Sequence, residues 1–271
     1  MIMKIRHLFL ALATGALLAS CAEDVEKLAK PHLDRAFQSF ANKQYALAKL
    51  QIDSIKQLYP KAFEARTQAG ALLLEVELAE AHTSLYYVDS LLDESVARAT
   101  TLASTLYLDK DARYQDYGTY YVARHRAEKN VGKSYLRPQA GEQDGVFTLT
   151  AFYRGKPIGA NALRFTASDG SYIDLQPIAE PHVMSDATGR TERTDFAATP
   201  DLAHFVNQHA SIKVALIGQT GKAQLPFAKA DAQALTQVAN LSAALKATTA
   251  LQAQQQELMR RISFYESKIK K

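Results

Sequence analysis

The spacing of apolar residues predicts two long helices that are far apart in the chain. Between residues 63 and 107, apolar side chains such as Leu85 and Leu92 recur every three or four positions over several heptads, a pattern typical of coiled coils. Residues 229–271 contain neither Gly nor Pro and keep a helical spacing. The side chains on that second stripe are Val238, Leu241, Leu245, Thr248, Gln255, Met259, Ile262 and Ile269, with Leu251, Leu258 and Tyr265 beside them. We therefore expect coiled-coil helices over 63–107 and 229–271.

A shorter helical pattern precedes the first long helix. One apolar helical face ends near Phe40, the polar run 42–44 interrupts it, and Ile52 belongs to a second face. Pro60 ends this second helix, because the residue before a proline avoids the helical region. The pattern predicts a pair of helices within 21–62.

Between the two long helices the apolar pattern changes to a period of two, which is typical of strands. Asp169-Gly170 and the run 218–221 are signals for hairpin turns, and Thr199-Pro200 predicts a short helix over 200–209. The expected strands are 146–153, 158–167, 172–175, 189–197, 212–217 and 222–227, with 154–157 as a turn. This many short strands favours a small antiparallel sandwich or barrel over 146–228, the β head.

The segment 108–145 has no clear period and carries several glycines and Pro138, so we interpret it as an irregular connection. It is rich in tyrosine and has Arg113, Arg124 and Arg126 nearby. The tyrosines concerned are Tyr107, Tyr114, Tyr117, Tyr120 and Tyr121. Tyrosine combines an apolar face with a polar tip, which suits interfaces and sugar stacking. The cluster is either a clamp that packs the connection against its surroundings, the reading we favour, or a partner- or glycan-binding surface.

The two long helices should pair with each other. Each has one apolar stripe to bury, and the first leads into the β region while the second leads out of it, so antiparallel pairing is expected. Acidic side chains dominate 67–107 and basic side chains dominate 229–271. In that register Glu75, Glu77 and Glu80 would lie near Arg260, Arg261 and Lys268.

The expected fold class is therefore α+β. It consists of an N-terminal helical hairpin, a long antiparallel coiled-coil stalk made by two distant helices, and a small antiparallel β head inserted between them. The alternative arrangement is a parallel coiled coil between copies of the chain, so the sequence leaves the oligomeric state open.

The N-terminus has the features of a secretory signal. Lys4 and Arg6 precede the apolar run 8–19, and small residues lead to Cys21. The run is too short to span a bilayer core of about 30 Å as a helix. The tetrad Leu-Ala-Ser-Cys at 18–21 resembles the lipobox of bacterial lipoproteins. This resemblance implies cleavage of 1–20, lipidation of the Cys21 thiol and attachment to a membrane through that lipid.

The residue after Cys21 is Ala22, where an Asp would resemble an inner-membrane retention signal. The expected location is therefore the cell envelope, with the outer membrane favoured and either its periplasmic face or the cell surface possible. The single Cys among 271 residues excludes a disulfide framework and zinc sites with several thiolates. The formal net charge of +4 falls to +2 without Lys4 and Arg6, and nothing in it suggests nucleic acid.

Motifs for catalysis are lacking in the sequence. The run 218–222 imitates part of a phosphate-binding loop, but Leu216 and Ala223 stand where that loop needs Gly and Ser or Thr. The histidines are scattered, and His204 and His209 are five apart, which does not suit two ligands on one helical face. We expect no catalytic residue, no metal and no cofactor, and keep a hydrolase in the β head as an alternative.

The stretch YALAKLQIDSIKQLYPKAFEAR resembles the second helix of a tetratricopeptide repeat, with Tyr45, Ala48 and Pro60 at that repeat's spacing. Together with the long coil, the run RPQAGEQDG and the β region, it also resembles a family of uncharacterised bacterial envelope lipoproteins. That resemblance implies the location and the architecture and no chemistry. The expected function is a non-enzymatic scaffold or partner-binding protein of the envelope. The alternative is glycan or peptidoglycan binding through Tyr114, Tyr117, Tyr120 and Tyr121.

Overall fold

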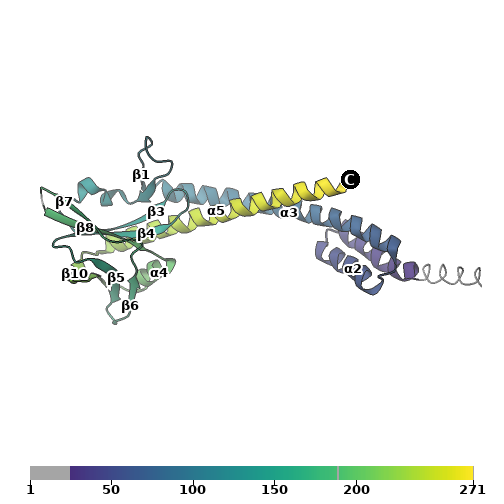
Figure 1. Cartoon of the computed structure of the whole chain (residues 1–271), viewed down its shortest axis with the longest axis horizontal. Coiled ribbons are helices and arrows are strands. Elements are labelled where there is room, and N and C mark those ends of the chain that lie inside the picture. The colour runs from purple at the N-terminus through teal and green to yellow at the C-terminus, as the bar shows by residue number, and fades with distance from the viewer. Residues whose placement is uncertain (1–24, 188, 271) are drawn as a thin grey trace, which may run out of the picture. The chain divides into compact units, whose positions relative to one another are not determined.

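Helices and two antiparallel sheets make up the chain in the computed structural model, which describes residues 25–187 and 189–270 (Figure 1). Helix accounts for 52% and strand for 24% of the residues, so the α+β class is confirmed. Two units can be distinguished. The helical unit contains the described residues up to Asp89 together with those from Ala253 onward, and the sheet unit is Ser90–Gln252.

The helical unit begins with a helix over 25–41, followed by α2 (Tyr45–Leu58) and the first part of α3 (Phe63–Ala103). The last part of α5 (Lys229–Ile269) belongs to it as well. The turn between the first two helices places Lys43 at φ 58°, and α2 ends just before Pro60 as expected. Small side chains dominate the buried core, which comprises Ala29, Leu33, Ala36, Ala48, Ile52, Ile55, Ala62, Ala65, Ala69, Leu72 and Val76.

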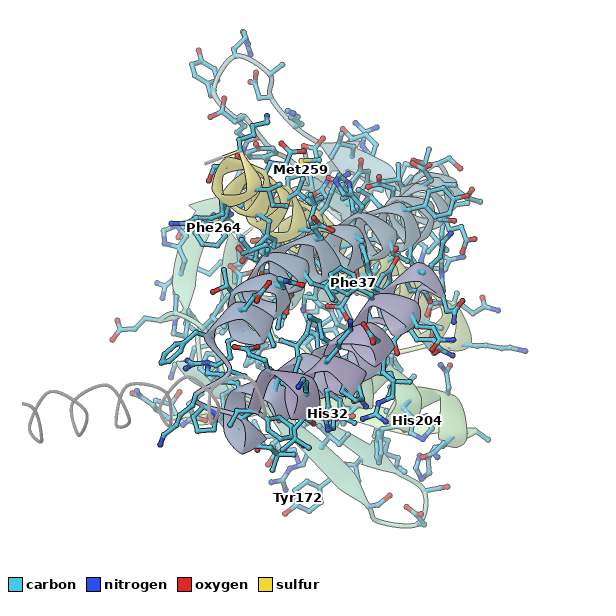
Figure 2. The ribbon with its side chains drawn as sticks, turned by 90° about the vertical axis from the view of Figure 1, so that its right-hand side faces the viewer. His32, Phe37, Tyr172, His204, Met259 and Phe264 are labelled. Atoms are coloured by element: carbon cyan, nitrogen blue, oxygen red, sulfur yellow. The ribbon has the colours of Figure 1, made fainter. Side chains whose placement is uncertain are left out.

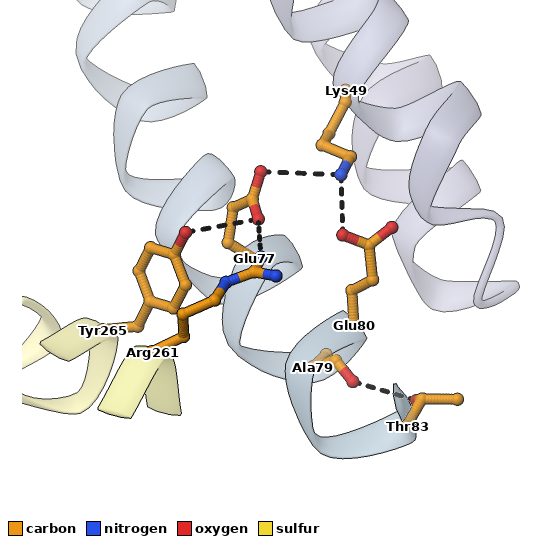
Figure 3. Close-up of polar contacts among 7 residues, drawn as sticks. All are labelled: Lys49, Glu77, Ala79, Glu80, Thr83, Arg261 and Tyr265. Carbon is orange, nitrogen blue, oxygen red and sulfur yellow. Dashed lines mark hydrogen bonds and ion pairs between the residues drawn. The ribbon is translucent and has the colours of Figure 1, made fainter. Parts of the chain in front are cut away.

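A network of charged groups links three helices of this unit (Figure 3). Glu77 of α3 accepts hydrogen bonds from Arg261 (3.1 Å) and Tyr265 (3.3 Å) of α5. Lys49 of α2 pairs with the carboxylates of Glu77 at 3.5 Å and Glu80 at 2.7 Å. The expected approach of Glu77 to Arg261 is thus confirmed, whereas Glu80 is held by Lys49.

Within the helical unit, α3 and α5 run in opposite directions. Glu77 of α3 pairs with Arg261 of α5, and Asp89, further along α3, accepts a hydrogen bond from the amide of Gln255 at 2.8 Å. Because Gln255 precedes Arg261 in the chain, the two helices are antiparallel here. On α3, Val88 is only 2% exposed. On α5, Leu258 is buried, whereas Met259, expected on the stripe, is 49% exposed and lies at the surface in Figure 2. Ile262, also expected on the stripe, is buried, so the buried face agrees with the expected stripe at Ile262 and differs from it at Met259.

The sheet unit contains two antiparallel sheets. The six-stranded sheet has the order β1-β2-β3-β4-β8-β7 and the four-stranded sheet the order β10-β9-β5-β6. The strands of the first are β1 (Tyr107–Asp109), β2 (Thr119–Tyr121), β3 (Tyr135–Gly141), β4 (Phe147–Arg154), β8 (Gly189–Ala197) and β7 (His182–Asp186). The strands of the second are β10 (Gly221–Leu225), β9 (Ile212–Gly218), β5 (Ala160–Ala167) and β6 (Tyr172–Leu175).

The interpretation of 108–145 as an irregular connection is wrong. This segment holds most of β1, all of β2 and β3, and two short 3-10 helices, η1 (Ala123–His125) and η2 (Ala127–Lys129). The first two strands have three residues each, too few to show a period of two. In β3, Pro138 resembles a strand breaker, but β2 pairs with β3 only at Gly141 and Ala140 and does not reach it. Helix α3 accordingly ends at Ala103, earlier than expected.

A large apolar core lies in this unit. It joins inward side chains of both sheets with α4 (Pro200–Gln208) and with the first part of α5. Leu202 and Val206 come from α4, and Leu235 and Val238 come from α5. The hairpins expected at 169–170 and 218–221 are confirmed by the pairing of β5 with β6 and of β9 with β10.

The turn at 154–157 leads from β4 in one sheet to β5 in the other, and a buried carboxylate holds the chain just after it. The Glu192 side chain is fully buried. It accepts hydrogen bonds from the backbone N–H groups of Ile158 (2.6 Å), Gly159 (3.2 Å) and Ala160 (2.6 Å). Glu192 therefore fixes the crossing between the sheets by satisfying donors that no strand pairs.

Candidate functional site

The structure divides the predicted tyrosine cluster into two groups. Tyr107 of β1 and Tyr121 of β2 are cross-strand neighbours with ring centroids 5.5 Å apart, and Tyr121 is only 3% exposed. Tyr114 and Tyr117 lie in the loop between these strands and are 80% and 53% exposed. Tyr120 is half-buried in β2, and burial raises the pKa of its hydroxyl.

Tyr107 and Tyr121 belong to a row of stacked side chains that crosses four strands, which we call the aromatic–arginine row. Its members in spatial order are Arg126, Tyr107, Tyr121, Arg137, Phe152, Tyr135 and His125. Guanidinium groups lie over rings along it, Tyr107 and Tyr121 meet edge to face, and Tyr135 stacks on Phe152. Contacts of a cation with an aromatic ring are favourable when the partners are partly desolvated. The clamp interpretation therefore fits Tyr107 and Tyr121.

One half of the row lies on β1, β2 and the first residues of β3, together with Arg126. The guanidinium carbon of Arg126 lies 4.4 Å from the ring centroid of Tyr107, and that of Arg137 lies 4.7 Å from the centroid of Tyr121. The Tyr121 hydroxyl donates to Asp109 at 2.7 Å. Burial and this hydrogen bond raise the pKa of Tyr121, so the phenol stays neutral at physiological pH.

The other half of the row lies on β3 and β4. Arg137 is also 5.1 Å from the centroid of Phe152, on which the Tyr135 ring stacks at 4.4 Å with an interplanar angle of 8°. The His125 ring follows at 6.5 Å. The sequence does not reveal these residues as a group. Tyr135 and Arg137 lie on β3, which was not predicted as a strand, and Phe152 lies on the predicted strand β4 without any pattern that links it to them.

His125 links the row to the start of α5. Its ring is 4% exposed, and its Nε2 lies 3.3 Å from a carboxylate oxygen of Asp231, which also accepts from Arg124 at 2.7 Å. The second Asp231 oxygen accepts the N–H of Ala228 at 2.7 Å. Burial opposes ionisation of Asp231, but the hydrogen bonds from His125 and Ala228 and the charge of Arg124 outweigh it and lower the pKa of this carboxyl.

The loop 110–118, which carries Tyr114 and Tyr117, extends away from the sheet next to β1 in Figure 1 and is held by polar contacts at both ends. The Gly118 N–H donates to Glu142 at 2.6 Å, and Lys110 pairs with the same carboxylate at 3.2 Å. The hydrogen bond from Gly118 and the charge of Lys110 lower the pKa of Glu142. A side chain at Gly118 would meet the carbonyl oxygen of Asp109 at 2.6 Å, so this position requires glycine.

Inside the loop, Asp111 orders the backbone. Its carbonyl accepts from the N–H groups of Tyr114 (3.0 Å) and Gln115 (2.9 Å), and its carboxylate pairs with Arg113 at 2.9 Å. A cation lies over each exposed ring. The Arg113 guanidinium is 5.3 Å from the Tyr114 centroid, and Lys110 is 5.9 Å from that of Tyr117.

The remaining expectations for sites have these outcomes. Cys21 lies outside the described residues. Within 25–187 and 189–270, no helix is long and apolar enough to cross a membrane, and no three or more His, Cys, Asp or Glu side chains are grouped to hold a metal ion. Comparisons of the chain with protein families, with curated proteins and with solved structures found no match.

Proposed function

We propose that the chain is a lipid-anchored, non-enzymatic protein of the bacterial cell envelope that binds a protein partner through the loop 110–118. The proposal retains the location expected from the lipobox, with the outer membrane favoured, and the family resemblance to envelope lipoproteins. It also retains the architecture, in which α3 and α5 form an antiparallel coiled-coil stalk and the sheets form the head inserted between them.

The observation that carries the proposal is the exposure of Tyr114 and Tyr117 on an ordered loop. Large aromatic side chains are enriched where proteins bind partners, because each buries much area for few rotatable bonds. The contacts of Asp111 and Glu142 order the loop in advance, so binding would cost less conformational entropy. Exposed rings on a loop fixed at both ends are therefore suited to recognition.

The alternative is binding of glycan or peptidoglycan by the same loop. It is favoured by the exposure of Tyr114 and Tyr117, since a tyrosine that is 80% exposed offers a surface on which a sugar can stack. The cations beside both rings would suit acidic groups on the glycan. Tyr120 and Tyr121 contribute less to this alternative, because Tyr121 is buried in the aromatic–arginine row.

The test compares two double substitutions in intact cells. Tyr114→Ala with Tyr117→Ala removes the exposed rings of the loop, and Tyr86→Ala with Tyr87→Ala removes two tyrosines of α3 that are 80% and 64% exposed. Photocrosslinking from position 116 is expected to give a defined protein adduct in the wild type and the α3 variant, and to lose it in the loop variant. Binding to purified cell-wall sacculi that is lost only in the loop variant would instead establish the glycan alternative. If the loop variant keeps both the protein adduct and any binding to sacculi, the partner-binding proposal and the glycan alternative are both refuted.

The anchor is tested separately. Cys21→Ser is expected to release the chain from membranes into the soluble fraction, because two or three acyl chains are the only feature proposed to retain it. The fractions are compared by immunoblot after a high-salt wash. A Cys21→Ser protein that still sediments with membranes would contradict the lipid anchor.

A further inference from the structure

Two guanidinium groups and a phenol converge on the outer face of the six-stranded sheet, away from the loop 110–118. Phe152 of β4 has Tyr135 as its cross-strand neighbour on β3 and Arg193 as its neighbour on β8. Arg137, two residues along from Tyr135, places its guanidinium 5.1 Å from the Phe152 ring. Tyr135 and Arg137 therefore contact the Phe152 ring, and Arg193 lies on the strand at its other side; Phe152 itself is 8% exposed.

The donors of this group exceed the acceptors that surround them. Arg137 uses its Nε–H on Gln139 at 3.1 Å, and its terminal nitrogens donate to no described residue. Arg193 donates from Nη2 to Asp195 at 3.0 Å, while its Nε–H is buried and has no acceptor in the described part of the chain. A buried charged donor without an acceptor costs free energy that an added acceptor would recover.

The nearby acidic group does not neutralise the site. Asp195 accepts from both Arg193 and the Thr150 hydroxyl, the latter at 2.5 Å, so its two oxygens are engaged. The Tyr135 hydroxyl donates to no described residue, and both guanidinium charges act on it, which opposes the increase in its pKa that burial causes. The Glu128 carboxylate also acts on the Tyr135 hydroxyl, but it is paired with Arg126, so the guanidinium groups of Arg137 and Arg193 are not neutralised by it.

We propose that Arg137, Arg193 and the Tyr135 hydroxyl form a binding site for an oxyanion, a carboxylate or phosphate group of a ligand. Planar guanidinium groups match the geometry of such groups and bind them through paired, charge-assisted hydrogen bonds. The stacks on Tyr121 and Phe152 fix the direction of Arg137, so its fork is ordered before the ligand arrives. The site is independent of the loop 110–118.

The experiment follows the side-chain Nε–H signals of arginine by NMR in the purified chain. Inorganic phosphate, acetate and chloride are titrated at constant ionic strength. We expect saturable shifts of the Arg137 and Arg193 signals with phosphate or acetate and none with chloride. Tighter binding of phosphate would indicate a phosphate group on the ligand, and tighter binding of acetate a carboxylate. Arg137→Gln should weaken binding about tenfold. Arg190→Gln, the same charge change at an exposed position of β8, should leave it unchanged.

Two milder variants keep the test decisive if Arg137→Gln perturbs the fold. Tyr135→Phe retains the stack on Phe152 and removes only the hydroxyl, so a severalfold weakening without loss of stability supports the site. Arg137→Lys retains the charge and removes the planar fork, and should also weaken binding. Shifts that are equal for all three anions, or equal in every variant, would show general screening and overturn the proposal.

Discussion

The helical unit and the sheet unit bury different kinds of side chain. Six of the eleven buried members of the helical core are alanines, and the only buried polar side chain there is Ser39 among the described residues. The sheet unit buries Phe and Leu side chains and, in addition, His125, Thr150, Glu192, Thr194 and Ser242. Helices satisfy their backbone internally, whereas chain that crosses between sheets needs acceptors from side chains. Glu192 and Ser242 bond backbone groups where the chain leaves a strand, whereas Thr150 and Thr194 lie within paired strands.

The largest effect should come from adding a charge to the apolar helical unit. Val88→Asp puts a carboxylate where the side chain is 2% exposed and should reduce the free energy of unfolding by about 4 kcal/mol or more. Tyr87→Asp makes the same charge change at the next position, which is 64% exposed, and should cost less than about 1 kcal/mol. Urea unfolding monitored by circular dichroism measures both. Equal losses would mean that α3 is not packed at Val88.

The next effect tests the buried carboxylate of the sheet unit. Glu192→Ala leaves the N–H groups of Ile158, Gly159 and Ala160 without their acceptor and should cost about 3 kcal/mol. Glu192→Gln retains one accepting oxygen and should cost less. The matched control is Glu180→Ala at an exposed position. Thermal and urea unfolding compare the three, and a silent Glu192→Ala would show that water can replace the carboxylate.

The smallest effect concerns Asp231 and depends on pH. Because its folded pKa is lowered, its contribution is present above the ordinary Asp pKa of about 3.9 and is lost as pH falls through the lowered value. Asp231→Asn should therefore cost about 1.5 kcal/mol at neutral pH, with the difference from wild type shrinking in acid. Urea unfolding from neutral pH to pH of about 3 measures it. The exposed Asp93→Asn serves as control, and a difference that grows in acid would contradict the assignment.

The elements that the sequence predicts are those with a regular pattern of burial. Helices α3 and α5 and most strands follow from periodicity, because burial of one face repeats along consecutive residues. The predicted seam was right at Val88, which is buried, whereas Leu85 and Leu92 on the same seam are only half-buried. β7 was not predicted because all five of its residues are exposed, so they show no alternation.

The candidate sites were predicted unevenly. The exposed Tyr114 and Tyr117 were identified by composition alone, since tyrosines gather there in the sequence. The row through Arg137 and Phe152 was not, because β3 was not recognised as a strand and the row depends on its register with β4. A single sequence does not determine the register of two paired strands, because the turn between them or a bulge can shift it.

The contribution of α5 to both units has a consequence for the order of events during synthesis. Leu235 and Val238 complete the apolar core of the sheet unit, and Leu258 and Ile262 are buried in the last part of the same helix. A chain made from its N-terminus therefore has strands β1 to β10 before it has the first part of α5, which contributes to their core. Until Leu235 and Val238 emerge, the strands expose apolar surface. A chaperone that shields nascent β structure would act in this interval.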